Sequence, residues 1–395
     1  MSEVANIPQL RFPGFSDEWE ERPLKDVSTF FNGKAYKQAE LLSSGKYPVL
    51  RVGNFFTNNS WYYSNLELDE NKYCDNGDLL YAWSASFGPR IWAGEKVIYH
   101  YHIWKVINHS QVTKKFLFIV LDNETAKMKA QSANGFALLH ITKGTIENWK
   151  INLPTRQEQQ KIAAFLAVVD SKIEQLSKKQ ALLGEYKKGL MQQIFSQAIR
   201  FKADDGSDFP DWEEKKLGDV FEIKAGQSKS KHIKKDGKNI IVDMGGISSE
   251  PKLVAKKLTD YDDDFLTTND LVMPKDDIGG GLIIGKVAEI PENNKYICGD
   301  HIYKLTVVNG NITFLKYAIN SYQVNKSFRQ KANGTAQIGL SRKEVENQLL
   351  SFPSLKEQTK IANFLSSIDS KIEQVGKQLN ESKQFKKALL QQMFV

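Results

Sequence analysis

The sequence predicts an α+β protein, in which two globular parts of mixed strands and helices are joined by two long helices forming an antiparallel coiled coil with pseudo-two-fold symmetry. Three observations lead to this fold class. One segment occurs twice, each copy begins with a helix-start signal, and each continues as a heptad pattern of apolar residues. With 395 residues, 41% hydrophobic and 26% charged, the chain has the composition of a globular protein of two to three domains.

The repeat extends through most of the chain. Residues 161–176 (KIAAFLAVVDSKIEQL) match residues 360–375 (KIANFLSSIDSKIEQV) at 11 of 16 positions, with an offset of 199. Shorter matches occur upstream of both copies: HIWKV (102–106) with HIYKL (301–305), NGFALLHIT (134–142) with NGTAQIGLS (333–341), WEERPLKDV (19–27) with WEEKKLGDV (212–220), and Gly33 with Gly226. Each copy is therefore a globular part followed by a helix.

The repeat divides the chain into four predicted parts. These are a first globular domain (1–152), a first coiled-coil helix (153–197), a second globular domain (198–351) and a second coiled-coil helix (352–395). The two copies differ most over residues 34–101 and 227–300.

Both helices have a recognisable start. Thr155 and Glu158 have the spacing of a capping box, and so do Ser354 and Glu357. In such a box the hydroxyl and the carboxylate accept from free backbone N–H groups of the first turn. A proline precedes each box and disfavours an earlier helical turn. We therefore expect helices from about these positions onward.

Apolar residues then recur at alternating steps of four and three, which is the pattern of a coiled-coil seam. The seam residues are Ile162, Leu166, Val169, Ile173, Leu176, Leu183 and Leu190 in the first helix, and Ile361, Leu365, Ile368, Ile372, Val375, Leu379 and Leu389 in the second. The alternative is an amphipathic helix lying on a globular core. A helix of about 57 Å is longer than the intervening domain is wide, about 38 Å, so the second helix is expected to run backwards along the first.

Charge and cysteine content narrow the class of protein. The net charge of +7 and a pI near 9.0 favour a polyanionic partner. A lysine-rich segment at residues 224–238 suits phosphate contacts, although a solvated lysine loop is the alternative. Cys74 and Cys298 are too few for a zinc site or a disulfide framework. With no membrane-length apolar run and no signal peptide, we expect a cytoplasmic location and no membrane partner.

Catalytic motifs are missing from the sequence. GGLIIGK (280–286) has the spacing of a phosphate-binding loop, but Val287 stands where a magnesium-binding hydroxyl is needed, and Pro291 interrupts the expected helix. It fits better as a glycine-rich hairpin. PDWEEK (210–215) fits a turn into a strand better than a nuclease site, and His102 and His301 fit structural roles. We therefore predict no catalytic residue and no metal site in a chain that acts as a binder.

Two variable globular parts, each followed by a nearly identical KIA(A/N)FL…(V/I)DSKIEQ helix, resemble the specificity subunits of type I restriction-modification systems, as does LRFPGFSDEWEERPLKDV near the start. The resemblance covers the whole chain. It implies that each globular part is a target-recognition domain reading one half of a bipartite, asymmetric target in double-stranded DNA. The coiled coil would set the spacing and dock two copies of a DNA methyltransferase subunit, and restriction (translocase) subunits would join through these.

The same resemblance assigns the chemistry to the partners, so this chain would hold no cofactor of its own. S-adenosylmethionine, ATP and magnesium are expected in the partner subunits, which would carry out DNA methylation and restriction. Two alternatives stay open: a stand-alone DNA-acting enzyme with an unfamiliar motif, and a coiled-coil scaffold that does not bind DNA. The first predicts activity in the purified chain, and the second predicts no DNA binding at any salt concentration.

Candidate DNA-binding residues are basic or polar side chains in expected loops. Lysine mostly contacts phosphate, whereas arginine and asparagine can also bind base edges. The candidates are Lys34, Tyr36, Lys37, Arg51, Asn54 and Arg90 in the first domain, and Lys229, Lys231, His232, Lys234, Lys235, Lys275, Arg329, Lys331 and Arg342 in the second.

Overall fold

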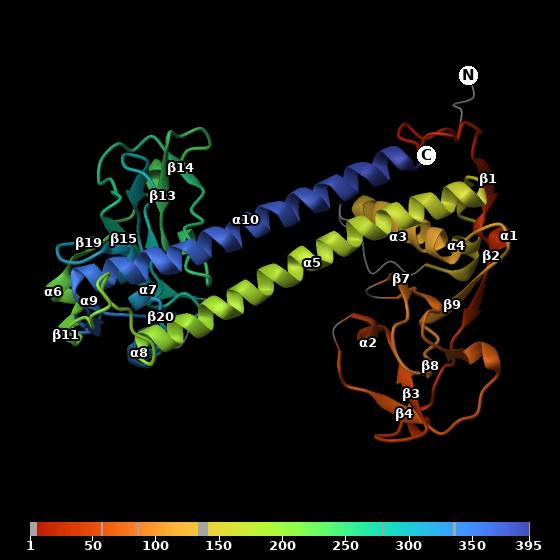
Figure 1. Cartoon of the computed structure of the whole chain (residues 1–395), viewed down its shortest axis with the longest axis horizontal. Helices are drawn as coiled ribbons and strands as arrows, with labels where there is room; N and C mark the ends of the chain where they lie inside the picture. The colour runs from red at the N-terminus through yellow and green to blue at the C-terminus, as the bar shows by residue number, and fades with distance from the viewer. Residues whose placement is uncertain are drawn as a thin grey trace. The chain divides into compact units, whose positions relative to one another are not determined.

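The computed structural model describes residues 6–56, 58–84, 87–132, 141–278, 280–334 and 337–394. The chain forms two compact units (Figure 1). Unit 1 comprises Met1–Ser177 and Gln378–Val395, and unit 2 comprises Lys178–Lys377. Each unit holds one globular part together with one end of each long helix, α5 (Arg156–Phe195) and α10 (Leu355–Met393). The sequence-based boundaries of the four parts stay predictions.

The globular part of unit 1 contains two four-stranded sheets, of order β2-β9-β6-β7 and β4-β3-β8-β5, and the two-stranded sheet β1-β10. In Figure 1, β3, β4 and β8 lie on the side away from α5, and α3 lies near the first half of α5. The elements are β1 (Glu20–Pro23), α1 (Leu24–Val27), β2 (Ser28–Asn32), β3 (Tyr47–Leu50), α2 (Val52–Phe56), β4 (Tyr62–Ser64), β5 (Tyr73–Cys74), β6 (Leu79–Ala82), β7 (Gly88–Ile91), β8 (Val97–Tyr99), β9 (Ile103–Asn108), α3 (Lys114–Ser132), α4 (Lys143–Glu147) and β10 (Lys150–Leu153).

Unit 2 repeats this plan. Its sheets have the orders β12-β19-β15-β17, β14-β13-β18, β11-β21 and β16-β20. The elements are β11 (Glu213–Lys216), α6 (Leu217–Val220), β12 (Phe221–Ala225), β13 (Asn239–Val242), β14 (Lys257–Thr259), β15 (Asp270–Pro274), β16 (Asp276–Asp277), β17 (Ala288–Glu289), β18 (Tyr296–Cys298), β19 (Ile302–Val307), α7 (Ile312–Ile319), α8 (Tyr322–Lys331), β20 (Ile338–Gly339), α9 (Arg342–Glu346) and β21 (Leu349–Phe352).

The repeat extends to strand pairing. In unit 1, β9 lies between β2 and β6, and all three run antiparallel to their neighbours; in unit 2, β19 lies in the same way between β12 and β15. The second sheet contains a parallel pair in both units, β3 with β8 and β13 with β18. The α+β fold and its duplication are as the sequence predicts. Residues 134–140 of the first NGFALLHIT copy lie outside the described residues.

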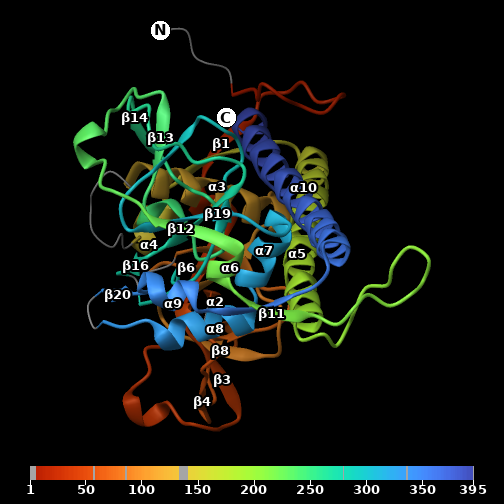
Figure 2. The same cartoon turned by 90° about the vertical axis from the view of Figure 1, so that its left-hand side faces the viewer.

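The long helices contribute to the core of each unit. In unit 1, Ile162 and Leu166 near the start of α5 share a buried cluster with Leu389 and Met393 near the end of α10. In unit 2, Ile361 and Leu365 near the start of α10 share a buried cluster with Ile194 near the end of α5. In Figure 2, α7 lies beside the first part of α10, which it contacts through the same cluster.

All fourteen predicted seam residues are buried or partly buried. Two polar residues that interrupt the heptad pattern, Lys187 and Lys386, have partners on the other helix: Lys386 pairs with Asp170 in unit 1 at 2.6 Å, and Lys187 pairs with Asp369 in unit 2 at 2.6 Å. These two pairs are repeat equivalents. The helices therefore run antiparallel within each unit, and the polar interruptions bind across the seam.

The predicted capping boxes are only half formed, because the glutamates bind elsewhere. Thr155 Oγ1 accepts from the backbone N–H of Glu158, but both carboxylate oxygens of Glu158 accept from Arg11, at 2.7 and 2.8 Å. In unit 2, Glu357 accepts from Arg200 Nη2 at 3.0 Å. Both glutamate side chains are fully buried. A guanidinium neutralises a buried carboxylate, which a backbone N–H alone cannot do, so the ion pair takes precedence over the cap.

Candidate nucleic-acid interface

Gly33 starts a short basic loop in unit 1, residues 33–37. A side chain at Gly33 would overlap the carbonyl oxygens of Tyr99 and His100, so glycine allows the loop to lie directly on this backbone. The Lys34 N–H donates to Tyr99 O at 3.0 Å, and the Tyr101 N–H donates to Lys34 O at 3.0 Å. The loop is therefore attached to residues 100–102, which precede β9 and are called here the entry turn of unit 1.

The entry turn of unit 1 is aromatic. The Tyr101 ring lies 4.4 Å from the ring of His100 and 4.0 Å from that of His102, and Tyr36 of the basic loop stacks on His100 at 6.3 Å. Trp83 Nε1, just after β6, donates to Tyr101 O at 2.8 Å. Burial, His102 and Arg51 together lower the pKa of His100 to about 4, so this ring is neutral at pH 7.

Unit 2 has the same arrangement with different side chains. Gly226 starts its basic loop, residues 226–235, and a side chain there would overlap Gly299 O. The entry turn of unit 2, residues 299–301, precedes β19. The backbone N–H of Lys275 donates to His301 O at 2.8 Å, as that of Trp83 donates to His102 O at 3.0 Å in unit 1. The two sites are therefore structurally equivalent.

Acidic side chains take the place of the aromatic ones in unit 2. His301 Nδ1 lies 2.7 Å from Asp276 Oδ2, and its Nε2 lies 3.6 Å from Asp300 Oδ2. Asp276 is mostly covered, whereas the side chain of Asp300 is 43% exposed. His301 has a φ of 60°, a left-handed conformation that shapes the turn. The exposed carboxylate of Asp300 thus follows Gly299, the residue against which Gly226, the start of the basic loop, lies.

The predicted lysines of unit 2 differ in availability. Lys229 is buried, with its ammonium group 3.4 Å from Asp264 and 4.7 Å from the centre of the Tyr261 ring. Lys234 pairs with Asp260 at 2.6 Å on the surface. Lys231, His232 and Lys235 are exposed, and so is Lys37 in unit 1. The exposed members are accessible to solvent, whereas Lys229 is not.

Other predicted residues of unit 1 bind within the fold. Arg51 Nη2 and Asn54 Nδ2 both donate to Ser60 O, at 3.2 and 2.9 Å, and thereby hold the segment after α2. The Arg51 guanidinium also lies 4.2 Å from the centre of the Tyr62 ring. The Arg90 guanidinium lies 5.0 Å from the centre of the Phe56 ring. None of these side chains joins the entry turn directly, although the charge of Arg51 acts on His100.

The candidates near the second Asn-Gly segment lie on α8 and α9. Lys331 donates to Gln348 at 2.8 Å, and Arg342 pairs with Glu346 at 2.6 Å. Arg329 donates to Gly281 O at 3.1 Å, close to Lys286, whose pKa is lowered by burial and by the charge of Arg329. Lys286 is a cation that the sequence analysis did not select, although it ends the GGLIIGK segment.

The GGLIIGK segment itself is no phosphate-binding loop. It lies in the connection between β15 and β17, which pair antiparallel, and the chain enters a strand after it where a phosphate loop requires a helix. PDWEEK leads into β11 as predicted. Sequence reasoning treated His102 and His301 as structural and missed Tyr101, Asp276 and Asp300. The available signal was that HIWKV and HIYKL match while the residues immediately before them differ.

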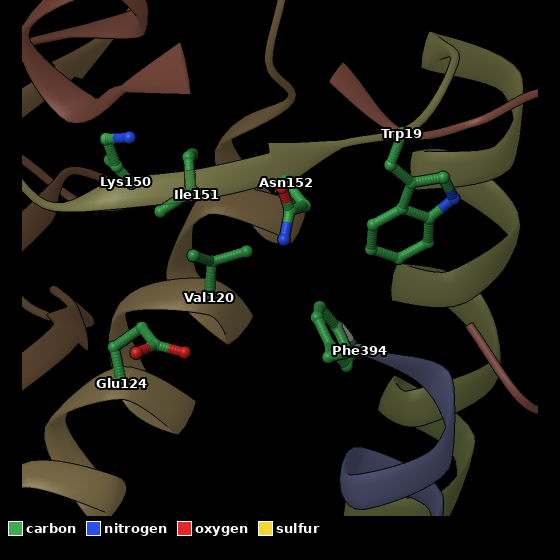
Figure 3. Close-up of a pocket in the computed structure, with 7 residues that line it drawn as sticks. All are labelled: Trp19, Val120, Glu124, Lys150, Ile151, Asn152 and Phe394. Carbon is green, nitrogen blue, oxygen red and sulfur yellow. The ribbon is translucent and has the colours of Figure 1, made fainter. Parts of the chain in front are cut away.

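A small cavity in unit 1 holds no cofactor-sized space. It lies between Trp19, α3, β10 and the end of α10, as Figure 3 shows, and its volume of about 30 Å³ is that of roughly one water molecule. Over the described ranges, no cluster of three or more His, Cys, Asp or Glu side chains could hold a metal ion. No helix in these ranges is long and apolar enough to cross a membrane.

The fold and the two equivalent sites define a class of protein, a duplicated chain with two long helices in which one scaffold carries two different exposed loop surfaces. The family model for the type I restriction modification DNA specificity domain matches the chain twice, over residues 16–183 and 210–383, so the chain belongs to this family.

Relatives agree along almost the whole chain. It is 27% identical to the type I restriction enzyme MjaVIII specificity subunit of Methanocaldococcus jannaschii, covering 96% of this chain and 92% of that protein. It is 22% identical to the EcoBI specificity subunit of Escherichia coli, covering 93% and 82%. The fold resembles that of a type I restriction-modification S subunit from M. genitalium, with a TM-score of 0.62, 15% identity and coverage of 98% and 99%. A structure from work on assembly of the type I system gives 0.54, with 17% identity and coverage of 96% and 98%.

Proposed function

We propose that this chain is the DNA-recognition subunit of a type I restriction-modification complex and that each globular part binds one half of a bipartite, asymmetric target in double-stranded DNA. The observation that carries the proposal is the pair of equivalent sites, each with a glycine-led basic loop laid on an entry turn, whose side chains differ between the halves. Two different surfaces on one scaffold suit two different half-sites.

The long helices set the spacing between the half-sites in this proposal. A helix of 40 residues such as α5 is about 60 Å long, which corresponds to about 17 base pairs as an upper guide. A rigid spacer makes binding depend on the gap between the half-sites as well as on their sequence. An inserted base pair also rotates one half-site around the duplex axis.

Two methyltransferase subunits dock on the helices in this proposal, and restriction subunits join through them. Tyr186 on α5 and Phe385 on α10 are repeat equivalents, and they are 57% and 54% exposed. Phe385 borders a surface groove of about 390 Å³ together with Lys172, Leu176 and Glu381. Exposed aromatic residues at equivalent places suit two copies of one partner. In this proposal the partner subunits bind S-adenosylmethionine, ATP and magnesium. This chain recognises DNA without catalysing a reaction. The complex works in the cytoplasm.

The test is sequence selection by the full chain in complex with its methyltransferase. Bound duplexes from a random library are expected to contain two unlike half-sites at one fixed gap. Binding is expected to fall by one to three orders of magnitude when the gap changes by one base pair. Two identical half-sites, or binding that ignores the gap, would contradict the proposal.

The basic loop of unit 2 provides a second check. Changing the exposed Lys231 and Lys235 together to glutamate is expected to weaken binding equally for all sequences. It is also expected to reduce the slope of log affinity against log salt by about two. Lys377→Glu, an exposed lysine on α10, serves as the matched control. Unchanged affinity and slope in the double variant would remove this loop from the interface.

A further inference from the structure

We propose that the entry turn is the base-contacting element of each globular part, and that Asp300 in unit 2 accepts a hydrogen bond from the exocyclic amine of a cytosine or adenine in the second half-site. This assignment rests on the proposed function and names the residues that determine which DNA bases are recognised. The corresponding element of unit 1 is Tyr101, flanked by two histidines.

The first residue of each basic loop lies on the entry turn. Gly33 and Gly226 occupy repeat-equivalent places, and Gly33 lies against His100 O whereas Gly226 lies against Gly299 O. A loop that binds phosphate fixes the height and register of whatever is attached to it along the duplex. The start of the basic loop contacts the entry turn in both units. Binding of the loop to the DNA phosphates would therefore bring the entry turn to the groove.

The two entry turns differ in their side chains although the surrounding backbone is the same. The strands that follow the entry turns match closely, IWKV in β9 and IYKL in β19, and each turn receives the same backbone hydrogen bond. The turns themselves read His-Tyr-His in unit 1 and Gly-Asp-His in unit 2. Side chains that only supported the frame would have no reason to differ in charge and shape where the frame is the same.

The carboxylate of Asp300 can accept hydrogen bonds from only a few groups of DNA. Asp300 Oδ1 accepts from the backbone N–H of His301 at 2.7 Å, while Oδ2 lies 3.6 Å from His301 Nε2 on an exposed side chain. A negative charge beside a phosphate-binding loop weakens binding to phosphate. In the major groove, a carboxylate finds donors only on the N4 amine of cytosine and the N6 amine of adenine. A carboxylate at this position therefore favours DNA binding only if it accepts from one of these amines at a base edge.

Unit 1 offers a different surface. Tyr101 is partly exposed, and the described residues place neutral His100 and the Trp83 and His102 rings around it. Aromatic rings and the neutral His100 imidazole suit apolar contact with a thymine methyl group or hydrogen bonds to base edges, and the entry turn of unit 1 has no carboxylate that would select an amine. We therefore expect the second half-site to be recognised through a carboxylate and the first through aromatic side chains.

The experiment repeats the library selection with the full chain in its methyltransferase complex, comparing the wild type with Asp300→Asn and with Tyr101→Ala. Asparagine keeps the side-chain oxygen that accepts from His301 and replaces the other oxygen with an amide NH2 group, which donates. Asp300→Asn is expected to reduce the preference at one position of the second half-site about tenfold and to leave the first half-site unchanged. Tyr101→Ala is expected to reduce the preference at one position of the first half-site and to leave the second half-site unchanged. Asp300→Ser, which removes the carboxylate with a small side chain, should lose the same preference.

The outcomes separate the inference from the proposed function. If the wild type selects no sequence, the proposed function fails and this inference fails with it. If the wild type selects a split target but Asp300→Asn and Asp300→Ser retain its full base preference, the inference alone is wrong. It is also wrong if both variants change affinity equally for all sequences, because Asp300 then acts only through its charge on phosphate.

Discussion

The two globular parts attach to their helices in nearly the same way and differ at the entry turn. Arg11 pairs with buried Glu158 in unit 1, and Arg200 pairs with buried Glu357 in unit 2. At the entry turn the same backbone frame carries Tyr101 between two histidines in unit 1, and Asp300 in the place of this tyrosine in unit 2. Where the chain must hold a helix start, the duplicated residues have kept their roles. At the entry turn, the proposed base-contacting element, they have diverged.

The largest expected effect tests the shared attachment. Arg11→Ala leaves the fully buried Glu158 carboxylate without its cation and is expected to lower the free energy of unfolding by about 3–5 kcal/mol. Arg200→Ala is expected to lower it by about 1 kcal/mol less, because Trp212 Nε1 also donates to Glu357, at 3.0 Å. Urea denaturation of the two variants measures the difference.

A second substitution provides the control for this comparison. Adding Glu158→Gln to Arg11→Ala removes the unpaired charge and is expected to restore part of the lost stability. If Arg200→Ala costs as much as Arg11→Ala, the tryptophan contact does not compensate, and the two attachments are more alike than their hydrogen bonds indicate.

The next effect tests the close contact between basic loop and entry turn. Gly33→Ala and Gly226→Ala each place a methyl group against carbonyl oxygens of the turn, which is expected to lower the free energy of unfolding by about 1–3 kcal/mol. Each is also expected to weaken DNA binding through its own half-site only. Gly184→Ala in α5, where a side chain meets open space, is the control and is expected to raise stability by about 1 kcal/mol.

The DNA measurement divides two explanations of these glycines. Loss of stability with unchanged binding to both half-sites would show that the contact holds the fold and does not position the interface. Thermal unfolding and half-site affinity measured on the same preparations separate the two.

The sequence predicted the fold well because the repeat and the heptads are local patterns that reflect burial directly. The seam positions from Ile162 to Leu389 are buried or partly buried. The capping boxes were predicted only in part, because Arg11 is 147 residues away from Glu158 and no local pattern connects them. The entry turn was missed for the same reason. Gly33 and His100 are far apart in the sequence and meet through the pairing of β2 with β9 and the bridge from Lys34 to His100, so composition pointed to the basic loop and not to the turn it contacts.

The smallest effect concerns the polar pairs across the helices, which look alike but have different surroundings. Lys386 in unit 1 lies near two carboxylates, Asp170 and Asp122, and the pKa of Asp122 is raised by burial and by Asp170 while Lys386 opposes that rise. In unit 2, Asp369 accepts from Lys187 and also from Tyr317 at 2.6 Å. Removing the lysine therefore leaves two like charges together in unit 1 and a hydrogen-bonded carboxylate in unit 2.

Lys386→Met is accordingly expected to lower the free energy of unfolding at pH 7 by about 1 kcal/mol, and Lys187→Met by less. Because the pKa of Asp122 is higher in the folded state than in the unfolded state, its contribution to stability is lost as pH rises through the folded value, and Lys386→Met should enlarge that loss. The gap between the variants should therefore narrow at pH 4, because the raised pKa of Asp122 favours its protonated form, and in 1 M salt, which screens the charges. A gap that is the same under all three conditions would mean that Lys386 stabilises unit 1 through the packing of its side-chain methylenes and not through its charge.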